Sequence, residues 1–433
     1  MKMKLLVLVM ASAMSAGQLA AAQTLEESVS QTLLNHPQIK EAYSLYQSRK
    51  YQIDEAKAGY YPKLDASAGV GPERIKDAGT SERTDMTRRD ASITLSQMLF
   101  DGFDTSSNVD RTDAEAKAQK LSLLSTAENT ALRVTEVYLN MLRQQEIFDL
   151  SKDNLATHEQ ILSDITKRTT SGVGSSADLS QIQGRVARAY SNMAAAQNNL
   201  DDARAEYLRV VNSEPSDLVE PAADSVVLPA SLDEALKQAT ANNPVLLSAL
   251  EDINAAQYQH EGAKANYYPK VSLEAGQNWY EDAGGDKGYS DNLSAMLRVR
   301  YNLFNGGADD ARSRSTSALY SQAKDIHMNA YRQVEEGTRL AWQAKESLKS
   351  QKEFQQQHVE YSYETVRAYK QQFTLGQRTL LDVLNTENEL FEARKSLIST
   401  QYDELYAQYR ILNATGTLLD SLKVKKPAEW SAD

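Results

Sequence analysis

Few residues in this 433-residue chain have the types and spacing that chemistry requires. The histidines show no spacing typical of metal ligands, and the sequence contains no phosphate-binding loop, nucleophile elbow or zinc motif. The aspartates and glutamates are scattered along helical stretches, where they usually form a solvated face. We therefore expect no enzymatic activity, no metal site and no cofactor. The histidines are His36, His158, His260, His327 and His358.

One small group of charged residues follows the two breaks in the helical pattern. Asp178 and Asp382 occupy equivalent positions in the two halves of the chain, one helical turn after a glycine-containing break. Copies of such a carboxylate held close together would have a raised proton affinity and would attract cations. Arg378 precedes Asp382 by four residues, so the alternative is an ordinary solvated i,i+4 pair.

The elements that position these residues belong to a unit that occurs twice in the chain. Residues 56–63 (AKAGYYPK) return 207 positions later as residues 263–270 (AKANYYPK), and residues 99–102 (LFDG) match residues 303–306 (LFNG) at an offset of 204. The change of offset predicts a three-residue deletion in one loop. We expect a first repeat over 23–211, a linker over 212–230, a second repeat over 231–416 and a C-terminal tail over 417–433.

Within each repeat, an alternating pattern predicts a pair of β-strands. The four strands are expected at about 62–71, 90–100, 269–280 and 292–304, near the ten residues that a tilted membrane-spanning strand needs. Flanking aromatic residues are typical of a membrane interface. The alternative is a pair of surface hairpins on a soluble sheet. We expect Leu95, Leu297 and Val299 to face lipid, and Thr94, Arg298 and Arg300 to face water.

The rest of each repeat predicts long helices. Residues 104–168 and 308–373 contain no proline, and each helix would be roughly 100 Å long. Helices over 176–211 and 378–413 follow, with apolar residues every seven positions that favour coiled-coil packing. Taken alone, these heptads are also compatible with a purely structural rod. The heptad positions are Leu179, Val186, Met193, Leu200 and Tyr207, and Leu384, Phe391, Ile398, Leu405 and Leu412.

The N-terminus and the composition indicate an exported membrane protein. Residues 1–22 have the basic start, apolar run and small-residue cleavage pattern of a secretory signal peptide. No later apolar run is long enough for a transmembrane helix, which leaves a closed β-barrel as the way to span a bilayer. Cysteine is absent, so no lipid-modified cysteine is expected. The formal net charge of −12 makes nucleic acid a poor partner.

The duplicated order of helix, Tyr-Tyr-Pro, hairpin, Leu-Phe-(Asp/Asn)-Gly, long helix, glycine-containing turn and heptad helix resembles the TolC-type outer membrane efflux protein family. The most specific segment is 375–385 (LGQRTLLDVLN), and the resemblance covers essentially the whole chain after residue 22. It implies a mainly α fold in which three copies share a twelve-stranded barrel in the outer membrane of a Gram-negative bacterium, above a periplasmic helical tunnel. It also implies a periplasmic membrane-fusion adaptor and an inner-membrane ABC transporter, or a proton-driven pump.

Within that family, segment 375–385 and the absent lipid-attachment cysteine resemble the type I protein-secretion branch more than the lipid-anchored drug-efflux branch. A large adhesin or toxin is a plausible cargo, and multidrug efflux is the alternative function. Two further alternatives are a periplasmic adaptor, which would need a glycine-rich lipoyl-like segment, and a structural coiled coil, which leaves the hairpins unexplained.

The resemblance also implies roles for residues at the two glycine-containing turns, which would form the periplasmic end where adaptor and pump dock. Three copies of Asp382 would line a closed entrance, and a pairing of Arg378 with Asp178 would hold it shut. Asn385 and Phe373 replace an aspartate and a tyrosine of the best-known member, which suggests a weaker gate. The docking residues would be Gly172, Val173, Gly174, Ser175, Leu375, Gly376, Gln377 and Thr379.

Overall fold

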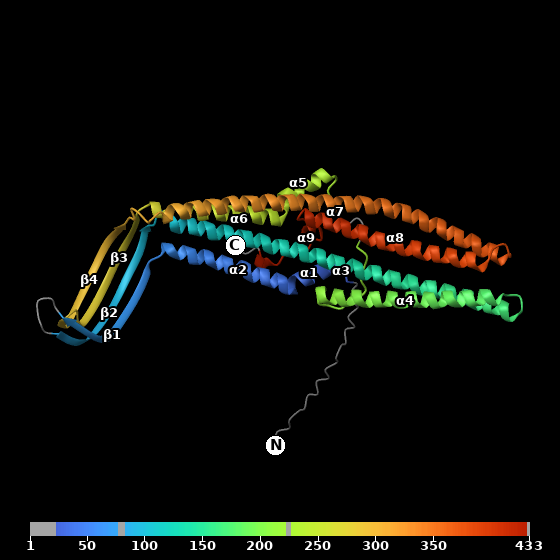
Figure 1. Ribbon diagram of the computed structural model, residues 1–433, viewed down its shortest axis with the longest axis horizontal. Coiled ribbons are helices and arrows are strands. Elements are labelled where there is room, and N and C mark those ends of the chain that lie inside the picture. The colour runs from blue at the N-terminus through green and yellow to red at the C-terminus, as the bar shows by residue number, and fades with distance from the viewer. Residues whose placement is uncertain (1–22, 77–82, 222–226, 431–433) are drawn as a thin grey trace, which may run out of the picture.

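The computed structural model describes residues 23–76, 83–221 and 227–430, and the predicted signal peptide lies outside them. The molecule is elongated, with a four-stranded sheet at one end and a bundle of long helices running away from it (Figure 1). The predicted fold class, mainly helical with a β part in a duplicated unit, is confirmed. None of the helices in the described ranges is both long and apolar enough to cross a membrane.

Two helices, α3 (Asp104–Thr170) and α7 (Ala308–Thr374), form the backbone of the bundle. Each has 67 residues, which corresponds to about 100 Å at the usual rise. Each turns back on an antiparallel partner, α4 (Ser176–Val211) after α3 and α8 (Leu380–Ala414) after α7, as Figure 1 shows. The heptad side chains Leu200, Tyr207 and Leu384 are buried, as expected for coiled-coil packing.

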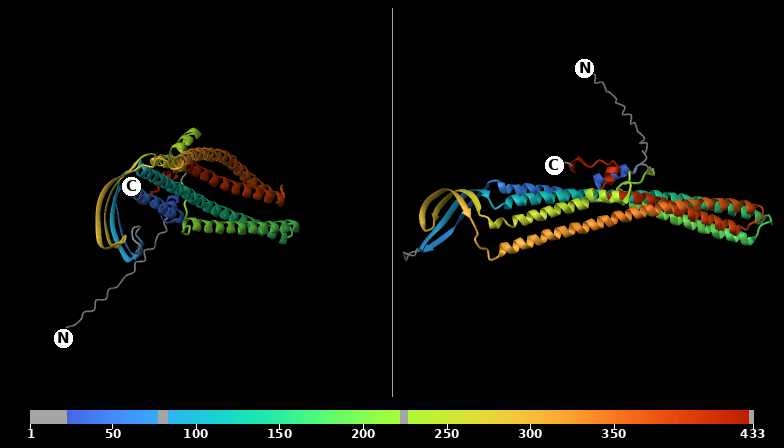
Figure 2. Two further views of the ribbon diagram at one scale, coloured as in Figure 1. Left: turned by 60° about the vertical axis from the view of Figure 1, so that its left-hand side comes forward. Right: turned by 90° about the horizontal axis from the view of Figure 1, so that it is seen from above.

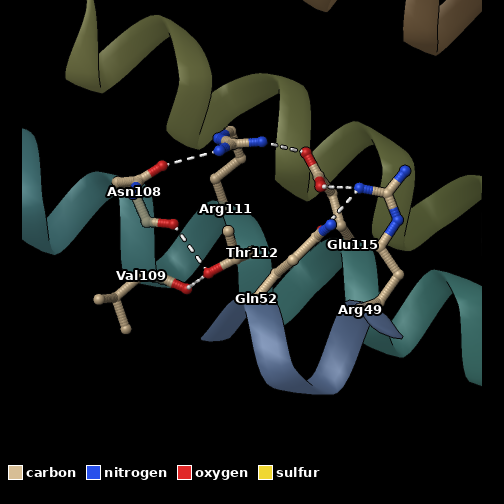
Figure 3. A network of polar contacts seen from close by, with 7 residues as sticks. All are labelled: Arg49, Gln52, Asn108, Val109, Arg111, Thr112 and Glu115. Carbon is tan, nitrogen blue, oxygen red and sulfur yellow. Dashed lines mark hydrogen bonds and ion pairs between the residues drawn. The ribbon is translucent and has the colours of Figure 1, made fainter. Parts of the chain in front are cut away.

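Shorter helices fill the half of the bundle near the sheet. They are α1 (Leu25–Asn35), α2 (Pro37–Lys57), α5 (Leu232–Asn242) and α6 (Pro244–Gly262), and both α2 and α6 begin with proline, whose missing N–H is not needed there. Both α2 and α6 lie along α3. Figure 3 shows the polar contacts between α2 and α3, in which Glu115 accepts hydrogen bonds from Arg49 and Arg111.

The sheet is antiparallel and has the order β1-β2-β3-β4. Its strands are β1 (Lys63–Lys76), β2 (Arg83–Phe100), β3 (Lys270–Ala283) and β4 (Asp286–Arg300). Strands β1 and β2 are longer than the expected 62–71 and 90–100, because the pairing continues through polar residues to Lys76 opposite Arg83. Cross-strand ion pairs such as Arg74–Asp85 join this polar part of the hairpin. The second hairpin closes at Gly284 and Gly285, which both have positive φ.

The register assigns the predicted strand residues to two faces. Residues opposite each other in antiparallel strands share a face, so Leu95 lies beside Leu64 and Ala275. Leu297 and Val299 belong to this same apolar face because they alternate with Arg298 along β4. Thr94, Arg298 and Arg300 lie on the opposite, polar face. The sheet is curved and remains open at both edges, β1 and β4 (Figure 2).

The main hydrophobic core lies where α1, α2, α3, α4, α8 and the C-terminal segment meet. Tyr138 of α3 is fully buried, and its hydroxyl lies 2.8 Å from the carbonyl oxygen of Gln23 and 2.7 Å from that of Val219 in the linker. The described part of the C-terminal segment also packs here, with Leu418 and Leu419 of α9 (Leu418–Ser421) fully buried. This segment is therefore part of the core.

One carboxylate joins the C-terminal segment to the centre of α3. Glu128 is 2% exposed and accepts hydrogen bonds from the backbone N–H groups of Leu418 and Leu419, at 3.2 and 3.3 Å. Burial raises the pKa of Glu128 to about 7, because these two hydrogen bonds only partly offset the cost of desolvating the charged form. The sequence alone gave no sign of this contact.

Candidate functional site

The two predicted turns lie together at the end of the bundle farthest from the sheet (Figure 1). In the first turn, the chain reverses its direction within the five residues between α3 and α4. Gly172 has φ +79°, and the N–H groups of Val173 and Gly174 both donate to the carbonyl of Arg168, at 3.0 and 2.9 Å. A Cβ atom at Gly174 would lie 2.7 Å from the backbone nitrogen of Thr169, so this position requires glycine.

The second turn repeats this arrangement with stronger capping. Gly376 has φ +75°, and the N–H of Gln377 donates to the carbonyl of Gln372 at 2.9 Å. Thr379 is the N-cap of α8 and forms a capping box with Asp382: the Asp382 N–H donates to the Thr379 hydroxyl oxygen, and the Thr379 N–H donates to the carboxylate. The helix therefore begins two residues later than the predicted position 378.

The two equivalent aspartates consequently have different environments. The Asp382 carboxylate also accepts a hydrogen bond from the Thr379 hydroxyl at 2.9 Å. Hydrogen bonds from the Thr379 side chain and backbone lower the pKa of Asp382, with a smaller contribution from the charge of Arg378. In the first repeat, Ser175 caps α4 through the N–H of Ala177. Asp178 makes no hydrogen bond or ion pair in the part of the chain that the structure describes.

Arg378 does not contact Asp178 within the described residues of one protomer, and a pairing of the two at the entrance stays a prediction. The Arg378 guanidinium lies over the ring of Tyr369, 4.3 Å from its centroid, and its Nε donates to the Gln372 side chain at 3.1 Å. Both partners belong to α7, so Arg378 is held against its own helical hairpin. This aromatic contact was not apparent from the spacing of Arg378 and Asp382.

Two other contacts do connect the first and second repeats near the turns. Arg185 of α4 donates a hydrogen bond to the side-chain oxygen of Asn385 in α8, at 2.7 Å. Arg168 of α3 lies 5.2 Å from the ring centroid of Phe373 in α7. Asn385 and Phe373 thus both contact arginines of the other repeat.

Sequence reasoning missed a small apolar cluster behind these contacts. It is made of the buried side chains Ile165 of α3, Ile182 of α4, and Leu380 and Leu384 of α8, with Phe373 packed against them. Heptad spacing identified Leu384 as buried but gave no information on which helices meet there. The cluster joins the tips of both helical hairpins in one protomer.

Beside the cluster, α3, α7 and α8 line a groove of about 580 Å³ that includes Ile161, Arg168 and Phe373. The turns themselves expose apolar side chains, since Val173 is 84% and Leu375 is 72% exposed. Exposed apolar groups beside charged ones are common where proteins bind other proteins. Across the described ranges, no group of three or more histidine, aspartate or glutamate side chains is arranged to hold a metal ion.

The chain matches the family model described as outer membrane efflux protein over residues 28–212 and 235–417. The two matched segments correspond to the two repeats and cover most of the chain. Each segment contains one helical turn of the site and one β-hairpin.

Individual proteins are similar over nearly their full lengths. The outer membrane efflux protein BepC of Brucella suis is 27% identical, with 93% of this chain and 87% of BepC covered. The alkaline protease secretion protein AprF of Pseudomonas aeruginosa is 24% identical, covering 89% of this chain and 83% of AprF. The crystal structure of the Campylobacter jejuni CmeC outer membrane channel has a TM-score of 0.79 and 15% identity, and covers 93% of this chain and 90% of CmeC.

Proposed function

Because the chain belongs to the outer membrane efflux protein family, we propose that it is the outer-membrane channel of a tripartite system that exports proteins. The observation that carries this proposal is the separation of the two ends of the molecule. One end is an open sheet with one apolar and one polar face, and the other is a pair of helical turns about a helix length away. Such a molecule can connect an outer membrane to a partner across the periplasm.

Three copies would complete the membrane-spanning part. Four strands cannot enclose a lumen, since single-chain barrels begin at about eight strands, whereas three chains supply twelve. In this barrel the face with Leu95, Leu297 and Val299 contacts lipid, and the face with Thr94, Arg298 and Arg300 lines water. The helices of the three copies then form a tunnel below it.

The helical turns would form the periplasmic end, where a membrane-fusion adaptor and an inner-membrane pump dock. The exposed Val173 and Leu375 offer apolar contacts there, and Gly172, Gly174 and Gly376 allow the chain to reverse sharply. Around a threefold axis, three copies of Asp382 would form the narrowest ring of the entrance. The contacts of Asn385 with Arg185 and of Phe373 with Arg168 would hold each protomer in the closed arrangement.

We infer that the cargo is a protein, delivered by an ABC transporter in the manner of type I secretion. The support is twofold: segment 375–385 resembles this branch of the family, and the similar protein AprF is named for secretion of alkaline protease. Efflux of small molecules, with a proton-driven pump, is the second candidate. It is favoured by the similarity to BepC, which is named an efflux protein.

Deletion of the gene separates these functions. For protein secretion, we expect at least one large protein to disappear from the medium of the deletion strain, while sensitivity to dyes and detergents stays at the wild-type level. Restored secretion by the plasmid-borne gene is the control. The opposite result, increased sensitivity with an unchanged set of secreted proteins, would assign the chain to efflux. If the protein does not fractionate with the outer membrane, the remaining alternatives are a periplasmic adaptor and a structural coiled coil.

A further inference from the structure

Within the described ranges, the edge strands β1 and β4 each pair with a strand on one side only. The internal repeat contains a model of the missing contact. Within one protomer, the second strand of the first hairpin, β2, pairs with the first strand of the next hairpin, β3. In a ring of protomers, β4 is again a second strand and β1 of the next protomer is again a first strand. The β2–β3 contact is therefore the repeat equivalent of the contact between protomers.

The equivalence can be made residue by residue because both hairpins have the same register at their base. Lys63 lies opposite Ser96, and Lys270 lies opposite Arg300, which matches the sequence offsets of 207 for first strands and 204 for second strands. The three-residue difference between the hairpins therefore lies toward their tips. In the β2–β3 contact, Leu95 lies opposite Ala275 and Ser96 opposite Glu274.

Applying the offsets to these pairs, we propose that β4 of one protomer pairs with β1 of the next in a single register, with Val299 opposite Ala68 and Arg300 opposite Ser67. This inference rests on the proposed trimeric barrel and specifies how its three seams are built. The register keeps the apolar faces of both strands on one side, because Val299 and Ala68 lie on the apolar face of their own sheets.

Aromatic residues below the sheet support the same equivalence. Phe100 ends β2 and packs edge-on against Tyr268, with ring centroids 6.5 Å apart. Its equivalent, Phe304, lies beyond the end of β4 and is 84% exposed, and the equivalent of Tyr268 is Tyr61, which is 68% exposed. Across the proposed seam, Phe304 packs on Tyr61 of the next protomer, and residues 301–304 gain the strand partner that residues 97–100 already have.

A glycine contact gives a third, independent indication. Gly102 lies so close to the neighbouring hairpin base that a Cβ atom would be 2.3 Å from the carbonyl oxygen of Ala265. Its equivalent, Gly306, also has a positive φ, but no atom of the residues that the structure describes lies within 4 Å of its Cβ position. The equivalent of Ala265 is Ala58. The seam would bring the backbone of Ala58 from the next protomer against Gly306 and fill this space.

Charge on the polar face is also complementary across the seam. Arg300 of β4 and Asp65 of β1 form no ion pair among the described residues of one protomer. Asp65 lies two residues from Ser67 on the same face, so it occupies the diagonal position relative to Arg300 of the neighbouring protomer. Diagonal side chains in antiparallel pairs are about 7–8 Å apart at their Cα atoms, within reach of arginine.

Cysteine cross-linking tests the register directly, because the chain contains no cysteine. The pairs Val299→Cys with Ala68→Cys and Arg300→Cys with Ser67→Cys are expected to form disulfides between protomers in the outer membrane. Successive residue pairs in an antiparallel ladder alternate between hydrogen-bonded and non-hydrogen-bonded pairs, which differ in their Cα–Cα distance. At least one of the two cysteine pairs should therefore have a geometry suitable for a disulfide. The matched controls, Val299→Cys with Ala66→Cys and Arg300→Cys with Asp65→Cys, shift the register by two residues and should cross-link several times less.

The possible outcomes distinguish a failure of the proposed register from a failure of the proposed channel function. Stronger cross-linking of the shifted pairs, or none in any pair while the protein remains trimeric, overturns the register and leaves the channel proposal intact. A monomeric protein in the membrane overturns both.

A second pair of variants tests the aromatic contact. Leu303 and Phe304 are similarly exposed in one protomer, at 85% and 84%. Phe304→Ala should reduce the fraction of trimer that resists SDS without heating, whereas Leu303→Ala should leave it close to wild type, because its equivalent Leu99 stays exposed beside a formed strand contact. Equal loss of trimer in both variants would contradict the proposed packing of Phe304 on Tyr61.

Discussion

At the residue scale, the most informative contrast is between two aspartates that the repeat makes equivalent. Asp382 is held by the cap of its own helix, whereas Asp178 is not, although both follow a glycine turn. The cap orients three symmetry-related Asp382 carboxylates in the same way relative to the proposed axis. Hydrogen bonds from Thr379 keep the pKa of Asp382 below its usual value in each protomer, which favours a charged ring and hence cation binding.

This contrast predicts the effect of removing one charge at a time. Asp382→Asn keeps an oxygen that can accept the Thr379 N–H but removes the charge, so multivalent cations should block the channel in planar bilayers at concentrations several times higher than for wild type. Asp178→Asn is the matched control and should leave the block nearly unchanged. If Asp178→Asn weakens the block as much as Asp382→Asn does, the ring does not consist of Asp382.

Glu128 gives a prediction about pH at the same scale. Its pKa of about 7 in the folded protein lies above the unfolded value of 4.5, so the folded state binds this proton more tightly. Stability contributed by protonated Glu128 is complete below about pH 4.5 and is lost as the pH rises through about 7. At about 1.4 kcal/mol per pKa unit, the loss has an upper limit of about 3 kcal/mol.

The stability of Glu128→Gln, measured by thermal unfolding, should therefore lack this part of the pH dependence. The variant is expected to gain stability relative to wild type at pH 8 and to lose that advantage at pH 5. Glu159→Gln, an exposed position on the same helix, is the control and should follow wild type at both pH values. Parallel pH profiles for wild type and Glu128→Gln would show that Glu128 does not titrate in this window.

At the element scale, local patterns predicted the helices well, because each long helix depends on periodicity and on the absence of proline over many residues. The turns were also predictable, since glycine is needed where φ is positive, as at Gly172 and Gly376. The strand ends were predicted less well. Residues 71–76 and 83–90 are mostly polar and include Pro72, yet they continue the ladder because the paired hairpin extends beyond its apolar band.

Contacts between helices that lie far apart in the sequence could not be predicted from the sequence. The hydrogen bond from Arg185 to Asn385 joins residues 200 positions apart, and the cluster of Ile182 with Leu384 joins the two repeats. Periodicity identifies the apolar side of each helix but not the helix that it meets. The same reason explains the missed contact of Glu128 with α9.

The contact between repeats predicts how easily the helical tips separate. A single hydrogen bond contributes about 1 kcal/mol, so Arg185→Ala or Asn385→Ala should shift a closed–open equilibrium by about fivefold toward the open state. Single-channel recordings would then show more frequent high-conductance states. Because the residues act on each other, the double variant should exceed either single variant only slightly.

The matched control is Arg188→Ala, which removes an exposed arginine from the next turn of α4. It should leave the conductance of the channel unchanged. Additive effects of the Arg185 and Asn385 variants, or an equal effect of Arg188→Ala, would indicate that general charge at the tip, rather than this contact, controls opening.

At the scale of the whole molecule, duplication explains both the shape of one protomer and its incompleteness. Each repeat supplies a hairpin at one end and a helical turn at the other, and the edges of the sheet and the exposed Phe304 are features that another copy would cover. The alternation of apolar and polar residues predicted the two faces of the strands, because side chains in a strand alternate regardless of partners. The closure of the barrel requires partners that one chain does not contain.

The most direct test of the channel is a single-channel recording of Thr94→Cys during addition of a charged, water-soluble thiol reagent. Thr94 is assigned to the lumen, and the chain has no other cysteine. We expect three discrete decreases in current, one for each protomer around the pore, and no decrease for the adjacent Leu95→Cys, which is assigned to lipid. Absence of a pore, a number of steps other than three, or steps in Leu95→Cys would contradict the proposed channel.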